Sequence, residues 1–324
     1  MGAVTATGPQ GQGQGQTLSS HPGLLAAGAA GCISALCALW AMRGLPLGTG
    51  VFWLASFPLF AAGLGFGPAS AVAAGLLALL LVAVSAGGFA ALIYLVLFGV
   101  PAPLLVAAAF RSGPGIAGPG GGQGGRFGLS LPLALLGLWP LAVLFGAAVL
   151  LADDGGLEAA LRETLTLSLA RFGLPAQEAL VAELVRVKAG AIGFWGAVSL
   201  LANAGAATAF LARRNLLPGP KPDWAAVRLP NWYPLLPGAA FGLFLAAPEE
   251  GDLVALSALL LLLVPLFLQG LAGVHRRLRG RQGRRPMLVA FYLLLVLFLQ
   301  VIGPGLVALG LYDQIQRRQA PRQS

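Results

Sequence analysis

Residues 253–274 read LVALSALLLLLVPLFLQGLAGV, a run without a single charged side chain. About 20 apolar residues, at a helical rise of about 1.5 Å each, cross the roughly 30 Å hydrocarbon core of a bilayer, so this run predicts a membrane-spanning helix. The rest of the chain has the same character, because 57% of its 324 residues are hydrophobic and only 10% are charged. Soluble domains carry roughly 25% charged residues. We therefore predict an all-α, polytopic transmembrane helix bundle.

Nine apolar stretches qualify as candidate spans, and we expect eight or nine crossings. Three of them are short, so they must tilt little or be partly buried in protein: Gly50–Phe66, Ala69–Ser85 and Trp232–Ala247. The other six are Leu24–Met42, Phe89–Phe110, Leu129–Ala152, Ala189–Ala212, Leu253–Val274 and Met287–Leu311.

The polar segments around these spans are mostly short. Residues 1–22 are rich in Gly, Gln, Thr and Ser and carry no charge, a composition typical of a disordered tail. Residues 315–324 form a basic tail, and residues 113–125 form a Gly-rich loop. We expect residues 23–314 to be a single transmembrane domain.

One soluble segment, residues 156–188, is larger. Its leucines recur every fourth residue and predict an amphipathic helix: Leu157, Leu161, Leu165 and Leu169. Pro175 can open a second short helix, which would complete a hairpin. The hairpin would either lie on the membrane surface and cap the bundle, or act as a lid over an outward-facing cavity.

Basic and acidic loops alternate along the chain. Nine of the eleven acidic residues fall in two loops, with members Asp153, Asp154, Glu158, Glu163, Glu178 and Glu183, then Glu249, Glu250 and Asp252. Basic residues fill three other loops, with members Arg111 and Arg126, then Arg213, Arg214, Lys221 and Arg228, then Arg276, Arg277, Arg279, Arg281, Arg284 and Arg285. The positive-inside rule places the basic loops in the cytoplasm and the acidic loops, with the hairpin, outside. The net charge of +9 belongs to this pattern, so we expect no nucleic-acid partner.

The basic tail breaks the alternation. Arg317, Arg318 and Arg322 would lie outside if Met287–Leu311 crossed the membrane once. Residues 303–305 read Gly-Pro-Gly and can kink or end a helix. Either a re-entrant pair of half-helices returns the tail to the cytoplasm, or one early span does not cross.

Catalytic chemistry finds little support in the sequence. The two histidines, His21 and His275, lie far apart, and no carboxylate pair falls inside a predicted span. No Cys/His spacing suggests a metal site. We predict that the protein is not an enzyme and needs no cofactor or metal.

Polar residues inside spans are costly and usually face a bundle interior or a cavity. The strongest candidates are the neutral amides Asn203, Gln269 and Gln300. Neutral amides suit hydrogen bonds between helices, and they equally suit recognition of a small polar solute. Whether the three converge on one cavity separates these interpretations.

Small residues form two neighbouring stripes on the first span. One contains Ala26, Ala30 and Ser34, and the other contains Ala27, Gly31 and Ala35. Such stripes let helices approach closely, either within the bundle or against a partner protein.

Four short segments resemble the YybS-like membrane proteins (domain of unknown function 2232) in their order and spacing. They read Leu59-Phe-Ala-Ala-Gly-Leu-Gly-Phe-Gly-Pro68, Leu229-Pro-Asn-Trp232, Phe267-Leu-Gln-Gly-Leu-Ala-Gly-Val-His275 and Leu309-Gly-Leu-Tyr-Asp-Gln314. That family is distantly similar to the substrate-binding S components of energy-coupling-factor transporters. S components capture a small molecule and dock on a membrane coupling subunit, partly through small residues of their first helix. The resemblance implies a bacterial inner membrane, although this chain has more spans than the six of an S component.

Two functional hypotheses follow from the sequence. In the first, the protein is a solute-binding or transport-related subunit, with an unknown small molecule and a coupling subunit as partners. In the second, it is a non-transporting scaffold or regulator that contacts other membrane proteins through its basic loops and tail. In both, the lipid bilayer surrounds the bundle.

Overall fold

The computed structural model describes residues 22–111, 127–171, 173–175, 177–247 and 252–319. Residues 1–21 of the predicted tail, the Gly-rich loop and the last five residues lie outside the described residues, as do Glu249 and Glu250. The described residues are mostly helical, and none of them lies in a strand. Its first half holds α1 (Pro22–Met42), α2 (Gly48–Trp53), α3 (Ser56–Phe66), α4 (Pro68–Ala86), α5 (Gly88–Tyr94), the π-helix η2 (Leu95–Gly99) and α6 (Pro101–Arg111).

The second half contains longer helices. They are α7 (Ser130–Leu150), α8 (Gly156–Arg171), α9 (Glu178–Arg213), α10 (Leu235–Ala246), α11 (Asp252–Arg277), α12 (Arg284–Leu297) and α13 (Leu299–Gln319). Two short 3₁₀ turns, η3 (Ala152–Asp154) and η4 (Trp224–Ala226), lie in the connections.

The outer surface of the bundle is apolar. Among the described residues, seven helical segments are long and apolar enough to cross a membrane, or eight if the bent pair α12 and α13 counts as one span. Large apolar side chains point outward along them, and Val84, Leu150 and Val296 are 80%, 81% and 78% exposed. Such a surface is stable in lipid but not in water, where contiguous apolar patches favour association. The chain is an all-α integral membrane protein, as the composition predicted.

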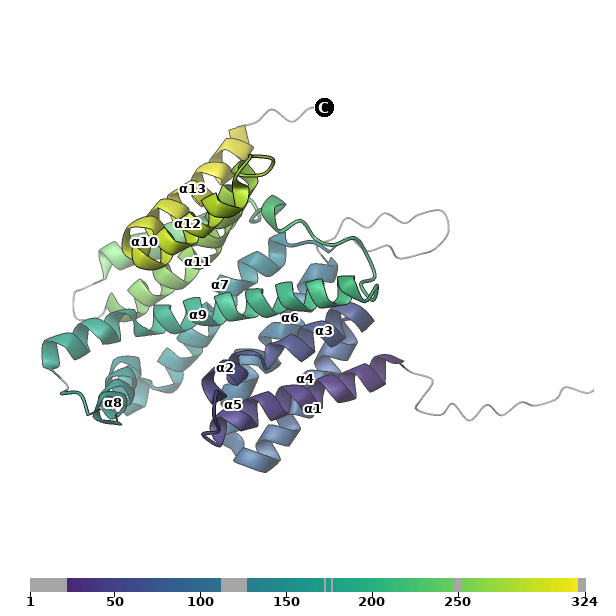
Figure 1. Ribbon diagram of the computed structural model, residues 1–324. Coiled ribbons are helices and arrows are strands. Elements are labelled where there is room, and N and C mark those ends of the chain that lie inside the picture. The colour runs from purple at the N-terminus through teal and green to yellow at the C-terminus, as the bar shows by residue number, and fades with distance from the viewer. Residues whose placement is uncertain (1–21, 112–126, 172, 176, 248–251, 320–324) are drawn as a thin grey trace, which may run out of the picture.

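The helices form two groups that share α9. In the first group α1 packs against α3 and α4, and in the second α11 packs against α7, α10 and α13. Helix α9 contacts both α3 and α11, and Figure 1 shows it running the length of the molecule between the groups.

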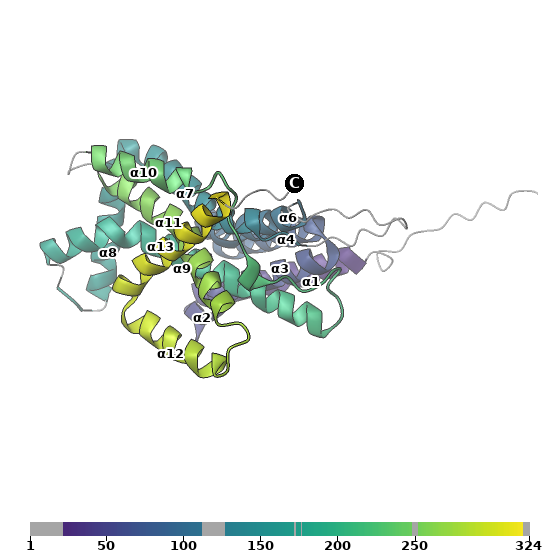
Figure 2. The same ribbon diagram turned by 90° about the horizontal axis from the view of Figure 1, so that it is seen from above.

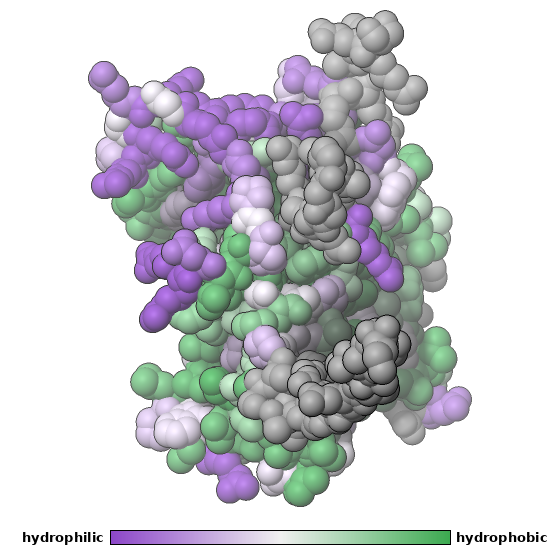
Figure 3. Space-filling model, turned by 90° about the vertical axis from the view of Figure 1, so that its right-hand side faces the viewer, coloured by the Kyte–Doolittle hydropathy of each residue, from purple (hydrophilic) through white to green (hydrophobic). Residues whose placement is uncertain are grey.

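The ends of the bundle differ in charge. We call one the basic end, because it carries Arg213, Arg214, Lys221 and the arginines from 276 to 285. The other is the acidic end, where α7 meets α8 and where α9 begins. Figure 3 looks onto the right-hand side of Figure 1, and hydrophilic side chains gather in its upper half.

The predicted hairpin is partly wrong. Helix α8 forms as expected, and its four leucines pack against Val181, Val185 and Leu253. The second arm is not a separate short helix, because α9 runs without interruption from Glu178 to Arg213. Residues 178–188 have no proline or glycine that would stop a helix, so the amphipathic arm and the following span merge.

Two of the predicted spans, Trp232–Ala247 and Met287–Leu311, also differ from simple crossings. Helix α10 covers only Leu235–Ala246, which is short for a span. Helices α12 and α13 meet at a bend of 117°, and Figure 2 shows α12 diverging from α13. The break lies at Phe298, before the Gly-Pro-Gly segment, and Pro304 sits inside α13. Prolines are tolerated within helices of membrane proteins because neighbouring groups satisfy the freed backbone carbonyl.

Helices α11 and α13 approach each other very closely. A Cβ atom added to Gly270 would lie 2.0 Å from the Leu306 carbonyl oxygen, and one added to Gly310 would lie 2.2 Å from the Leu266 carbonyl oxygen. Only glycine fits at these two positions, because any side chain would overlap the backbone of the facing helix. This crossing fixes the direction of the final helix against the rest of the bundle.

Candidate functional site

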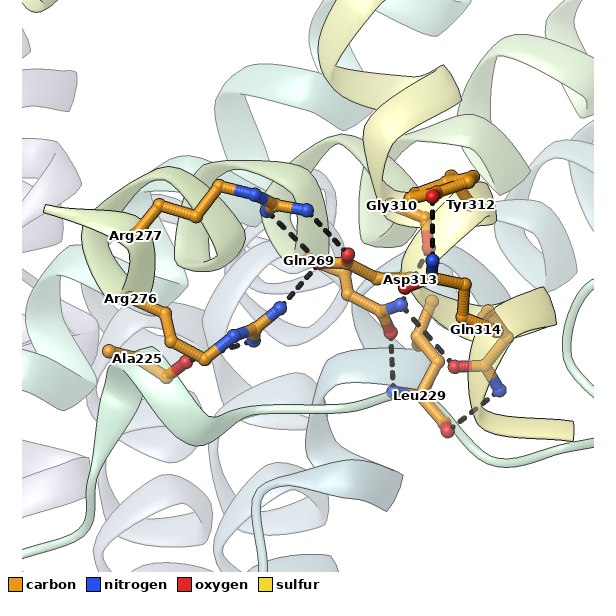
Figure 4. Close-up of polar contacts among 10 residues, drawn as sticks. Ala225, Leu229, Gln269, Arg276, Arg277, Gly310, Tyr312, Asp313 and Gln314 are labelled. Carbon is orange, nitrogen blue, oxygen red and sulfur yellow. Dashed lines mark hydrogen bonds and ion pairs between the residues drawn. The ribbon is translucent and has the colours of Figure 1, made fainter. Parts of the chain in front are cut away.

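The amide of Gln269 joins three segments of the chain, as Figure 4 shows. Its Oε1 accepts a 2.7 Å hydrogen bond from the Leu229 backbone, and its Nε2 donates to the Gly310 carbonyl, also at 2.7 Å. The Nε2 of Gln314 donates to the Leu229 carbonyl at 3.1 Å. Both amides are almost fully buried, at 2% and 1% exposure. Gln269 therefore makes hydrogen bonds between helices, one of the two roles considered for it.

The same junction unites three of the four short segments that were compared with another family from the sequence alone. Leu229 belongs to one, Gln269 to the second, and Gly310 and Gln314 to the third. These segments are brought together by buried hydrogen bonds, which are costly to leave unmade. Their role in this structure is to hold α11, α13 and the chain before α10 in place.

The three candidate amides do not converge. Asn203 of α9 is buried, and its Nδ2 donates to the Trp53 carbonyl at 2.7 Å, which ties α9 to the end of α2. Gln300 lies at the start of α13 and is exposed. Neither of these residues, nor Gln269, lines either of the cavities described below.

The small-residue stripes of α1 face inward. Ala27, Ala30, Gly31, Ser34 and Ala35 are buried, and Ala26 is half-buried. Helix α1 packs against α4, and a Cβ added to Gly31 would lie 2.7 Å from the Ala74 carbonyl oxygen of that helix. Ser34 also bonds to Tyr94, at 2.6 Å. Of the two roles considered for the stripes, the structure therefore shows packing within the bundle.

Two carboxylates outside the acidic loops are each held by arginine. Asp313 of α13 accepts hydrogen bonds from Arg276 at 2.5 Å and Arg277 at 2.8 Å. Asp223 accepts two from Arg279, at 2.6 and 2.9 Å. The hydrogen bond from Arg279 holds the pKa of the Asp223 carboxyl below its usual range. Both pairs lie at the basic end.

The candidate site is a cavity of about 600 Å³ between the two helix groups at the basic end. Its inner wall is apolar and comes from five helices, with Phe60 of α3, Val106 of α6, Leu133 of α7, Leu200 of α9 and Leu268 of α11. Ligand sites of drug-sized molecules have volumes of roughly 300–1,000 Å³ and mostly apolar walls. This cavity has the size and lining of such a site.

The mouth of this cavity is polar and basic. Lys221, Arg279 and Arg284 line it together with Asp223, so the four side chains carry three positive charges and one negative, a net +2. His275 and Tyr292 complete the mouth, joined by a 2.8 Å hydrogen bond between the His275 Nε2 and the Tyr292 hydroxyl.

A second cavity of about 270 Å³ lies closer to the acidic end. Along α7 the first cavity is lined from Pro132 to Leu136 and the second from Leu135 to Ala147. Along α9 the order reverses, as it must for an antiparallel neighbour, with 189–200 lining the second cavity and 200–208 the first. The two cavities are thus stacked along the bundle.

Three leucines line both cavities and form the layer between them. They are Leu105 of α6, Leu136 of α7 and Leu200 of α9. Leu161 of α8 lines the second cavity near the acidic end, so the amphipathic helix contributes to its outer wall.

Sequence reasoning did not single out most of the cavity residues. The wall is made of Leu, Phe, Val and Ala, which are everywhere in this chain and carry no signal of their own. A signal existed for Asp223, because it and Asp313 are the two acidic residues outside the acidic loops. In the described residues, no group of three or more His, Cys, Asp or Glu side chains could hold a metal ion.

No protein-family model, curated protein or solved structure matches the chain. Its class therefore rests on its own helices and composition, which make it a multi-pass integral membrane protein.

Proposed function

We propose that this protein is a solute-binding, transport-related membrane protein without an energy source of its own. The observation that carries the proposal is the stacking of two cavities between the same helices, separated only by the layer of Leu105, Leu136 and Leu200. A structural bundle needs no such voids, because membrane helices gain stability from close packing. Two stacked cavities form a path along the bundle, and such a path suits a molecule that enters at one end and moves toward the other.

The charge pattern supports an orientation for this path. The positive-inside rule places the basic end, and with it the larger cavity, at the cytoplasmic face of a bacterial inner membrane. The second cavity and α8 then lie toward the outside, and the contribution of Leu161 to the wall of that cavity supports the role of α8 as a lid. The resemblance to YybS-like proteins, and through them to S components, points to the same functional class.

The test is to block the first cavity without disturbing the fold. Gly205 of α9 lines the cavity, and a Cβ added there meets no atom within 4 Å, so Gly205→Leu places a side chain in open space. Gly146→Leu on α7 is the matched control, because it is also unobstructed and lines neither cavity. Leucine favours helix over glycine by roughly 0.5–1 kcal/mol, so both variants should fold.

Mass spectrometry of small molecules that co-purify with each variant gives the readout. We expect at least one molecule to accompany the native protein and Gly146→Leu but to be lost from Gly205→Leu. If all three preparations carry the same molecules, or none, the proposal is wrong.

The scaffold hypothesis makes a different prediction for partners. Crosslinking in membranes followed by pull-down should recover a coupling subunit and its ATPases if the protein is transport-related. Recovery of division or envelope proteins instead would favour the scaffold. The stripe on α1 is buried against α4, so a partner would have to use another surface.

A further inference from the structure

We propose that the first cavity binds a single-chain anionic amphiphile, with its alkyl chain among the apolar side chains and its anionic group at the basic mouth. This inference rests on the proposed function and names the class of ligand. It follows from the division of the cavity into an apolar interior and a cationic rim.

The rim carries more positive charges than its one carboxylate can pair. Arg279 is occupied by Asp223, which it contacts through both guanidinium nitrogens. Among the described residues, Lys221 and Arg284 form no ion pair with a carboxylate, yet both line the mouth. An anionic group placed between them would gain charge-assisted hydrogen bonds, which are about twice as strong as neutral ones.

The mouth also offers neutral polar groups. The Tyr292 hydroxyl and the His275 ring lie on the same rim and form one hydrogen bond to each other, which leaves the hydroxyl further bonding capacity. A phosphate or carboxylate could therefore receive both charged and neutral hydrogen bonds. A cationic head group would meet the net charge of +2 and be repelled.

The interior excludes a free inorganic anion as the preferred ligand. Phe60, Val106 and Leu133 on its wall are at most 5% exposed and present only carbon atoms to the cavity. A bare phosphate would leave this apolar surface without a partner, whereas an alkyl chain covers it. The volume of about 600 Å³ is that of a site for one drug-sized ligand, which favours one chain over two.

The experiment measures binding to the full chain in neutral detergent by native mass spectrometry. The probes are dodecyl phosphate, dodecanol, dodecyltrimethylammonium, inorganic phosphate and diacyl phosphatidylglycerol. We expect dodecyl phosphate to bind at least tenfold more tightly than each of the other four. Each methylene removed from the alkyl chain should weaken binding about fourfold, which corresponds to about 0.8 kcal/mol. Decyl phosphate, which is two methylenes shorter than dodecyl phosphate, tests this dependence on chain length.

Two sets of variants locate the binding. Combining Lys221→Gln with Arg284→Gln should lower the affinity for dodecyl phosphate about tenfold and leave that for dodecanol unchanged. Arg285→Gln is the control, because Arg285 is adjacent in sequence but does not line the cavity. Asp223→Asn should raise the affinity for dodecyl phosphate, since it removes the one negative charge on the rim.

The outcomes separate this inference from the proposed function. If dodecanol or the ammonium compound binds as tightly as dodecyl phosphate, and Gly205→Leu blocks it, the cavity is a ligand site but not an anionic one. If phosphatidylglycerol binds more tightly, the single-chain assignment is wrong. If Gly205→Leu blocks none of the probes and no co-purifying molecule, both proposals fail.

Discussion

Asp313 accepts a 2.8 Å hydrogen bond from Arg277, and this contact places the end of α13 beside the end of α11. Arg276 bonds the same carboxylate at 2.5 Å. Since α11 ends at the basic end of the bundle, residue 313 lies at that end too. Helix α12 therefore begins, and α13 ends, at the same end of the bundle, which is the arrangement that a re-entrant pair requires.

The first prediction concerns topology. We expect reporters fused before Pro22 and after Ser324 to lie on the same side of a bacterial inner membrane. A fluorescent protein that folds only in the cytoplasm should be bright at both positions, and alkaline phosphatase, active only outside, should be inactive at both. A phosphatase active after Ser324 alone would mean that α12 and α13 cross the membrane as one span.

The second prediction concerns the ion pair itself. Asp313 is 12% exposed, so Asp313→Asn should remove charge-assisted hydrogen bonds and lower stability by about 1–3 kcal/mol. Asp223→Asn is the matched control, because Asp223 is 46% exposed and exposed pairs contribute roughly 0–1 kcal/mol. Thermal unfolding in detergent, followed by near-ultraviolet circular dichroism, measures both. Equal loss in the two variants would contradict a structural role specific to Asp313.

Hydropathy identified the spanning helices because the signal is local. Residues 253–274 predict a helix from their own composition, and α11 forms over that range. The 117° bend at Phe298 could not be predicted in the same way, because no proline or glycine marks it. It depends on how α13 packs against α11, which involves residues distant in sequence.

The polar residues show the same limit. Gln269 is a candidate from the sequence because an amide inside an apolar run is conspicuous, whereas Gln314 is not a candidate span residue because it lies where the run gives way to polar residues. Only the fold brings the two within 3.3 Å of each other. The cavity could not be predicted from the sequence for a further reason. Its inner wall depends on how five helices pack together and not on any one stretch of sequence.

The third prediction compares two of the candidate amides. Gln269→Met should remove the hydrogen bonds that the amide makes to the Leu229 N–H and the Gly310 carbonyl, and so lower stability by about 1–3 kcal/mol. Gln300→Met changes an exposed residue and should stay within about 0.5 kcal/mol of the native protein. Thermal unfolding in detergent again gives the comparison. A stability unchanged by Gln269→Met would show that its hydrogen bonds do not hold the junction.

The fourth prediction concerns the crossing of α11 and α13. Gly310→Ala places a Cβ where the Leu266 carbonyl oxygen lies 2.2 Å away, so the helices must separate, and overpacking of this kind costs roughly 1–3 kcal/mol. Gly305→Ala makes the same change on the same helix, where a Cβ meets no atom within 4 Å. Because alanine favours helix by roughly 0.5–1 kcal/mol, that variant should be at least as stable as the native protein. The fraction of protein that stays monodisperse after heating should fall for Gly310→Ala only. If both variants behave alike, the close approach at Gly310 does not limit stability.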